Sequence, residues 1–155
     1  MGVPALSETI VEQWADRRWR LNNLYFIQDK LGNVVQFNLN AAQSQLLDDL
    51  HFLNIILKAR QMGFSTFILM LALDCCVFNS NFAAGLVADT IDNAKGLLKR
   101  VKFAYERMPA EIRSIVQIKT DNAYGVEFAN GSGIEVEATL CHHQESTHNR
   151  LPNKI

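Results

Sequence analysis

Two apolar runs joined by a short polar loop form the most restrictive feature of this sequence. The first run covers residues 52–57, the loop covers residues 58–63, and the second run covers residues 67–78. The first run contains two isoleucines and predicts a strand buried on both faces. The second run is 12 residues long and contains Asp74, so it predicts a buried helix that is too short to cross a bilayer.

The rest of the chain supplies the other elements of an α/β fold. Thr9 and Glu12 predict a capped helix that ends near residue 18, and Pro109 predicts the end of a later helix. The further predictions are a hairpin of residues 25–28 and 34–37, a helix over 41–50, a strand over 82–88, a helix from 92, and strands over 125–129 and 134–138. The order strand, loop, helix, strand, helix indicates a parallel sheet with crossover helices.

Composition and charge are those of one soluble globular domain. The chain has 155 residues, of which 48% are apolar and 20% are charged. The formal net charge of −1 does not indicate a nucleic-acid or acidic-lipid partner. Cys75 and Cys76 are adjacent and Cys141 is remote, so the cysteines do not form a disulfide framework, and we expect a reducing, cytoplasmic compartment. Because the longest apolar run is too short to cross a bilayer, we expect no membrane association.

The loop has the ingredients of a phosphate-binding site. Such a loop needs backbone N–H groups at the start of a buried helix, a cation beside the phosphates, and a hydroxyl for Mg²⁺. The usual pattern is Gly, four residues, Gly-Lys, then Ser or Thr, whereas this chain has Lys58, four residues, Gly63, Phe64 and Ser65. Arg60 can supply the missing cation because its guanidinium suits phosphate oxygens, and Lys58 is the second candidate.

Residues 56–66, Ile-Leu-Lys-Ala-Arg-Gln-Met-Gly-Phe-Ser-Thr, resemble the deviant Walker A motif of large terminase subunits, the DNA-packaging ATPases of tailed bacteriophages. The similarity extends from about residue 21 to residue 136. It implies that Arg60 contacts the phosphates and stabilises the charge of the transition state. It also implies that Gly63 allows a close backbone approach and that Ser65 holds Mg²⁺. Residues 37–43 are similar to the adenine-recognition segment, in which Gln43 would contact the base.

The resemblance implies a complete set of expectations about fold and function. The fold would be a partial P-loop NTPase of the ASCE type, with a parallel sheet, flanking helices and an N-terminal β-hairpin. Residues 1–137 would form an incomplete ATPase domain, and 138–155 a polar tail outside the family pattern. The cofactors would be ATP and Mg²⁺, and the partners double-stranded DNA, the portal and the small terminase subunit. The nucleotide-binding residues would be Gln43, Lys58, Arg60, Gln61, Gly63, Ser65 and Thr66.

The sequence departs from the family where catalysis would be completed. The family carries an Asp-Glu pair after a later apolar strand, and a nuclease domain follows, but this chain contains no Asp-Glu pair. We therefore expect a truncated prophage product with weak nucleotide binding, little turnover, and self-association through an open sheet edge. The alternatives are a fragment of a helicase-like P-loop ATPase, a non-enzymatic remnant, and an unrelated α/β protein.

Several candidate residues also have structural explanations. Gln43 follows Asn40 by three positions, so it could close a capping box, with or without a role at adenine. Gly63 could belong to an ordinary strand-to-helix turn. Asp89 follows an apolar strand like a magnesium ligand, but Thr90 follows it instead of a glutamate, which favours a strand-end or capping role.

For the charged and possible metal-ligating residues elsewhere in the chain, interpretations without a binding site are preferred. A lysine stripe on the helix from residue 92 could touch DNA, but a solvated helix face is the preferred interpretation; it comprises Lys95, Lys99 and Lys102. A row of alternating glutamates should face solvent; it comprises Glu127, Glu135 and Glu137. A zinc site is not favoured, because the spacing of its candidate ligands matches no common site; these are Cys141, His142, His143 and His148.

Overall fold

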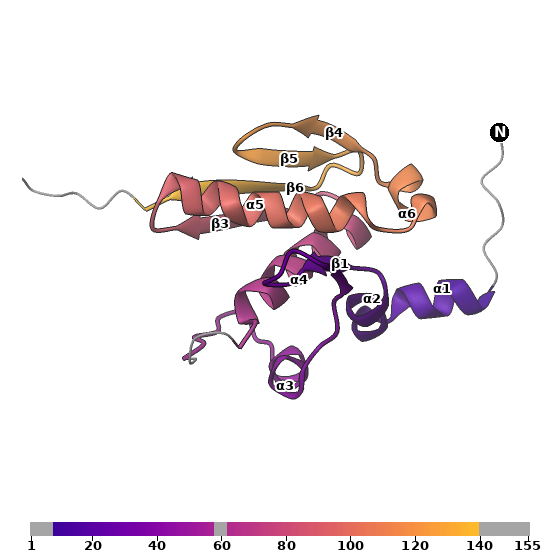
Figure 1. The fold of residues 1–155 in the computed structure, drawn as a ribbon. Helices are drawn as coiled ribbons and strands as arrows, with labels where there is room; N and C mark the ends of the chain where they lie inside the picture. Colours follow the sequence, from indigo (N-terminus) through magenta and orange to yellow (C-terminus); the bar gives the residue numbers. More distant parts are fainter. Residues whose placement is uncertain (1–7, 58–61, 140–155) are drawn as a thin grey trace, which may run out of the picture.

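A mixed four-stranded sheet covered by helices on one face forms the upper part of the molecule in Figure 1. The structure is a computed structural model that describes residues 8–57 and 62–139. The helices are α1 (Glu8–Ala15), α2 (Arg17–Asn23), α3 (Ala41–Asp48), α4 (Phe64–Phe78), α5 (Ile91–Glu106) and α6 (Ala110–Ile115). The strands are β1 (Phe26–Gln28), β2 (Val34–Gln36), β3 (Ala83–Ala88), β4 (Ile118–Asp121), β5 (Gly125–Phe128) and β6 (Gly133–Ala138).

The sheet has the strand order β3-β6-β5-β4, and β1 and β2 form a separate hairpin. β3 and β6 are parallel, with Ala83 opposite Gly133 and Ala88 opposite Ala138. The β6–β5 and β5–β4 pairs are antiparallel. The α/β class, the flanking helices and the N-terminal hairpin are therefore confirmed, whereas the expected parallel sheet is reduced to one parallel pair.

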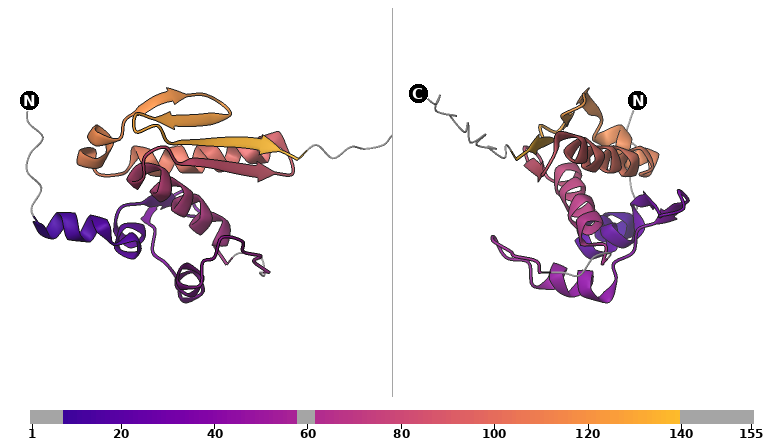
Figure 2. Two further views of the ribbon diagram at one scale, coloured as in Figure 1. Left: turned by 180° about the vertical axis from the view of Figure 1, so that it is seen from behind. Right: turned by 60° about the vertical axis from the view of Figure 1, so that its left-hand side comes forward.

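α4 lies at the centre of the described structure and is buried on both sides. Phe67, Met70 and Leu73 have no exposed surface, and α4 packs against α2, α5 and the sheet. Figure 2 shows the sheet and α5 above α4, and α1, α2 and α3 below it, while the hairpin contacts α5 through β1. Burial on both sides explains why its sequence is apolar all round and confirms the predicted buried helix.

The turn between β5 and β6 fixes the C-terminal end of α4 to the sheet. Asn130 donates from Nδ2 to the carbonyls of Cys76 at 2.8 Å and Asn79 at 3.0 Å. Ser132 donates from Oγ to the carbonyl of Asn79 at 2.7 Å and accepts from the N–H of Phe82 at 3.0 Å. These bonds satisfy helix-end carbonyls that have no intrahelical partner. The turn between the two strands predicted over 125–129 and 134–138 therefore has a structural role.

The predicted strand over residues 52–57 is wrong. The segment forms no helix or strand; four of its five large apolar side chains are exposed, and Ile56 is partly buried against the core. The amide of Asn54 instead exchanges two hydrogen bonds with the backbone of His51, at 3.0 Å and 2.6 Å. A strand is stable only when another strand pairs with it, and the described sheet offers no strand beside this segment. The local composition indicated a preference for the strand conformation, but it could not show that no partner strand of the described sheet lies beside the segment.

The N-terminal helix also differs from its prediction. Instead of one helix ending near residue 18, α1 ends at Ala15 and α2 begins at Arg17. Asp16 separates them because its carboxylate accepts the N–H of Arg18 at 2.8 Å and caps α2. α6 was not predicted; Pro109 both follows α5 and stands at the N-cap of this short helix. The polar tail predicted at 138–155 lies outside the described residues from 140 onward.

Candidate functional site

Gly63 opens α4 in a conformation that favours glycine. Its φ of 73° and ψ of 6° lie in the left-handed region, and it provides no side-chain cap. The first N–H groups of a helix have no intrahelical acceptor, so the start of α4 presents donors of the kind that bind anions. Ser65 on this first turn is exposed and Thr66 is half-buried. Lys58, Arg60 and Gln61 lie outside the described residues.

Two side chains at the N-terminal end of α3 bind the backbone of Met62, the residue before Gly63. Asn40 and Gln43 form the capping box: Asn40 Oδ1 accepts the N–H of Gln43 at 2.9 Å, and Gln43 Oε1 accepts the N–H of Asn40 at 3.0 Å. Both side-chain amides also donate to the carbonyl of Met62, at 3.3 Å from Asn40 and 3.5 Å from Gln43. The capping-box explanation of Gln43 is confirmed. The same bonds fix the position of the backbone that enters α4.

Gln43 and Gly63 are in direct contact. Gln43 is 3% exposed, and a Cβ on residue 63 would lie 2.8 Å from its Nε2 atom. The structure therefore brings four of the predicted residues to one place, namely Gln43, Gly63, Ser65 and Thr66. The amide of Gln43 is engaged with Asn40 and Met62, so contact with an adenine edge would require these bonds to be shared or exchanged.

A cleft of about 650 Å³ extends from the start of α4 across to α5 and the hairpin. Its lining combines glycine and hydroxyl residues at the start of α4 with basic residues from the hairpin and α5: Gly63, Ser65, Thr66, Lys30, Lys99 and Arg100. Asp29 also lines it, and hydrogen bonds from Asn33 lower the pKa of its carboxyl group, so Asp29 stays charged. The cleft thus combines anion-binding donors with cations and one carboxylate.

The three lysines of α5 do not behave alike. Lys99 lines the cleft, and Lys95 places its ammonium 4.8 Å from the centre of the Tyr124 ring. Lys102 is half-buried; it pairs with Asp121 and donates to the carbonyl of Asn122 at 2.6 Å. The expectation of a uniformly solvated stripe is therefore wrong for Lys102, because the turn after β4 reaches over α5 and supplies acceptors.

The acidic candidates have the structural roles that were favoured. Asp89 directly follows β3, is exposed, and accepts from the N–H of Thr90 at 2.9 Å and from Nδ2 of Asn93 at 2.7 Å. Thr90 is the N-cap of α5, so of the two structural roles expected for Asp89 the strand-end role is confirmed. The glutamate row, Glu127, Glu135 and Glu137, is exposed as expected. Among the described residues, no group of three or more His, Cys, Asp or Glu side chains is placed to hold a metal ion. The Cys and His candidates at 141–148 lie outside them.

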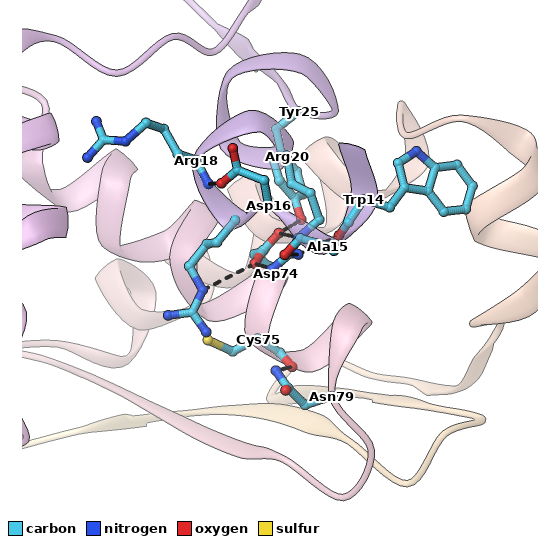
Figure 3. Close-up of polar contacts among 10 residues, drawn as sticks. Trp14, Ala15, Asp16, Arg18, Arg20, Tyr25, Asp74, Cys75 and Asn79 are labelled. Carbon is cyan, nitrogen blue, oxygen red and sulfur yellow. Dashed lines mark hydrogen bonds and ion pairs between the residues drawn. The ribbon is translucent and has the colours of Figure 1, made fainter. Parts of the chain in front are cut away.

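A buried ionic cluster between α2 and α4 was not predicted (Figure 3). Arg20 donates from Nε and Nη2 to the two carboxylate oxygens of Asp74, at 2.8 Å and 2.7 Å. Tyr25 donates its hydroxyl to Oδ1 of Asp74 at 2.8 Å. Arg20 also donates from Nη1 to the carbonyls of Trp14 at 2.6 Å and Ala15 at 3.1 Å. Every oxygen of the fully buried carboxylate is thereby paired.

The charges of this cluster stabilise one another. Burial by itself would lower the pKa of Arg20, but the hydrogen bonds and charge of Asp74 outweigh it and raise that pKa. Burial, and then the charge of Asp74, raise the pKa of Tyr25 well above its ordinary value, so its hydroxyl remains a donor. The cluster fixes α4 against α2 and so orients the helix whose start lines the cleft. The available signal in the sequence was a single carboxylate inside an apolar helix, which requires a partner when buried.

Comparison with known proteins leaves the family unassigned. No protein-family model matches the chain, and no curated protein matches it. No helix among the described residues combines the length and apolar character needed to span a membrane. The site's own geometry therefore carries the functional argument.

Proposed function

We propose that this chain is the phosphate-binding part of an ATPase domain of the large terminase subunit kind. The observation that carries the proposal is the left-handed Gly63 at the start of buried α4, in a cleft shared with Ser65 and Lys99. This combination supplies free N–H donors, a hydroxyl and a cation, which are what a polyphosphate with Mg²⁺ requires.

Each loop residue has a proposed role in binding. Arg60, with Lys58 and Gln61, would contact the phosphates from within the loop, as the resemblance implies. Ser65 would hold Mg²⁺ through its hydroxyl, a hard oxygen ligand on the exposed first turn of α4. Gln43 would position the loop through Met62 and reach adenine when the nucleotide binds.

The reaction in this class is attack of water on the γ-phosphate of ATP. Arg60 and the N–H groups at the start of α4 would stabilise the charge that develops on the transferred group. A glutamate that orients the water belongs to the Asp-Glu pair, and this sequence contains no such pair. We therefore expect the chain by itself to bind ATP weakly and to hydrolyse it very slowly.

The proposed partners follow from the same resemblance. In an assembly with an intact packaging subunit, hydrolysis would drive double-stranded DNA through a portal in the bacterial cytoplasm, with the small terminase subunit present. A pull-down from a phage-infected host with this chain as bait tests that part separately. Recovery of the portal or of the small subunit supports it, and recovery of neither contradicts it.

The binding proposal is tested by titration with a fluorescent ATP analogue in the presence of Mg²⁺. The wild-type chain should bind, and Arg60→Ala should weaken binding by at least about tenfold, because a charge-assisted contact to phosphate is lost. Arg113→Ala is the matched control, since Arg113 lies on α6 and donates from Nε to the carbonyl of Met108 at 3.0 Å, outside the cleft. Equal affinity of the wild type and Arg60→Ala, or binding by neither, contradicts the proposal.

A further inference from the structure

β3 presents one complete edge that no strand of the described sheet covers. It is the outer strand of the order β3-β6-β5-β4. The carbonyl of Ala88 accepts the N–H of Thr139 at 2.8 Å, which directs Ala88 toward the β6 side. Successive residues of a strand direct their backbone groups to opposite sides. The residues that face the open edge with both N–H and C=O are therefore Ala83, Gly85 and Val87.

This edge has none of the features that usually prevent further pairing. Natural edge strands are protected by lysine, proline, inward charges or bulges. The sequence of β3 is Ala-Ala-Gly-Leu-Val-Ala, with neither charge nor proline, and its pairing with β6 is regular over all six residues. β3 can therefore accept another strand without rearrangement of the sheet.

The same chain carries an unpaired segment suited to that edge. Residues 52–57, Phe-Leu-Asn-Ile-Ile-Leu, have the apolar and β-branched composition of a strand but form none. Their exposed fractions are 91% for Phe52, 72% for Leu53, 83% for Ile55 and 95% for Leu57, whereas Ile56 is partly buried against the core. The segment and β3 have six residues each, and neither contains a charge that would repel the other.

The segment does not reach β3 of its own molecule in this structure. It lies beyond the N-terminal end of α4, on the side away from the sheet, in both Figure 1 and Figure 2. Within the described residues of a single copy, both the donor segment and the acceptor edge are thus without a partner strand. Two copies related by a twofold axis can satisfy both at once, because each donates its segment to the other's β3.

We propose that residues 52–57 bind the open edge of β3 in a second copy of this chain, which gives a reciprocal strand-exchanged dimer. The segment becomes a strand only on pairing, which removes its apolar side chains from water and supplies partners for the edge N–H and C=O groups. Neither stretch lines the cleft at Gly63, and the dimer is tested without added nucleotide, so its outcome is separate from that of the binding proposal.

Sedimentation velocity over a concentration series tests the proposal with the full chain. The wild type should shift toward twice its 17.5 kDa mass as concentration rises. Ile55→Lys should weaken the dimer at least about tenfold, because a charge replaces an apolar side chain that pairing buries. Leu31→Lys is the matched control: Leu31 is exposed to 86% on the hairpin turn and lies in neither stretch, so this variant should dimerise as the wild type does.

A second variant addresses the acceptor edge. Val87→Pro removes an N–H that faces the open edge and leaves the hydrogen bonds to β6 in place, so it should weaken the dimer without unfolding the chain. Circular dichroism verifies the fold of each variant. A wild type that stays monomeric, or an association that Ile55→Lys weakens and a folded Val87→Pro does not, overturns the proposal.

Discussion

The side-chain amide of Gln43 occupies the space that a side chain at Gly63 would need. A Cβ on residue 63 would lie 2.8 Å from Nε2 of Gln43, closer than unbonded atoms of this kind approach. The same amide donates to the carbonyl of Met62 at 3.5 Å. The capping box of α3 and the start of α4 are therefore one structural unit, and substitutions at either end should affect the other.

Substitution of Gly63 tests this unit. Gly63→Ala should lower the free energy of unfolding by about 1–2 kcal/mol through left-handed strain, and by more through contact with Gln43. Gly32→Ala separates the two effects, since Gly32 has a φ of 85° but nothing within 4 Å of its Cβ position. Urea denaturation gives both values. Equal losses in the two variants would show that Gln43 does not restrict residue 63.

The buried ion pair should dominate the stability of α4. Asp74→Asn leaves the Arg20 guanidinium buried without its counter-charge, so the free energy of unfolding should fall by about 3–5 kcal/mol. Asp48→Asn removes the exposed partner of Arg18 and should cost at most about 1 kcal/mol. Because Tyr25 also loses its acceptor, the triple variant Arg20→Met, Asp74→Leu and Tyr25→Phe is the one that should recover part of the loss. A small effect of Asp74→Asn in urea denaturation would contradict the assigned role.

Alkaline pH should destabilise the fold through Tyr25. Its pKa is raised in the folded state by burial and then by Asp74, so above about pH 10 the unfolded chain loses the proton while the folded chain retains it. The free energy of unfolding therefore falls as pH rises above that point. Burial also raises the pKa of Cys76 to about 12, which adds a loss in the same direction.

A comparison of variants isolates the tyrosine. Tyr25→Phe should be less stable than the wild type at neutral pH and should lose less stability on going to high pH. Tyr124→Phe keeps an exposed ring on the turn before β5 and should retain the wild-type pH dependence. Thermal melts at several pH values measure the difference. Parallel curves for the wild type and Tyr25→Phe would exclude Tyr25 as the source.

The sequence predicted those elements whose signals are local. The hairpin turn, the Asn40 cap, α4, β3 and α5 each depend on residues within a few positions of one another. The strand at 52–57 was wrong because strand formation depends on a distant partner. The ionic cluster was missed for the same reason, since Asp74 is 54 positions from Arg20 and 49 from Tyr25. Lys99 likewise lines the cleft with Gly63 only because α5 packs beside the start of α4, and no sequence motif indicates this placement.

Lys99 should contribute to anion binding, whereas Lys95 on the same helix should not. Lys99→Ala should weaken binding of the ATP analogue about three- to tenfold, a moderate loss because the side chain is exposed. Lys95→Ala removes a charge of the same kind that lies over the Tyr124 ring, outside the cleft. Equal losses in both variants would indicate a general effect of net charge.

The central claim is that phosphate groups bind the backbone at the start of α4. Two-dimensional ¹H–¹⁵N spectra, recorded during separate titrations with Mg²⁺-ATP, pyrophosphate and adenosine, test it most directly. The claim predicts that the amide signals of Gly63, Phe64 and Ser65 move with ATP and with pyrophosphate, and move much less with adenosine. Unchanged signals with both phosphate ligands, or equal shifts with adenosine, would contradict it.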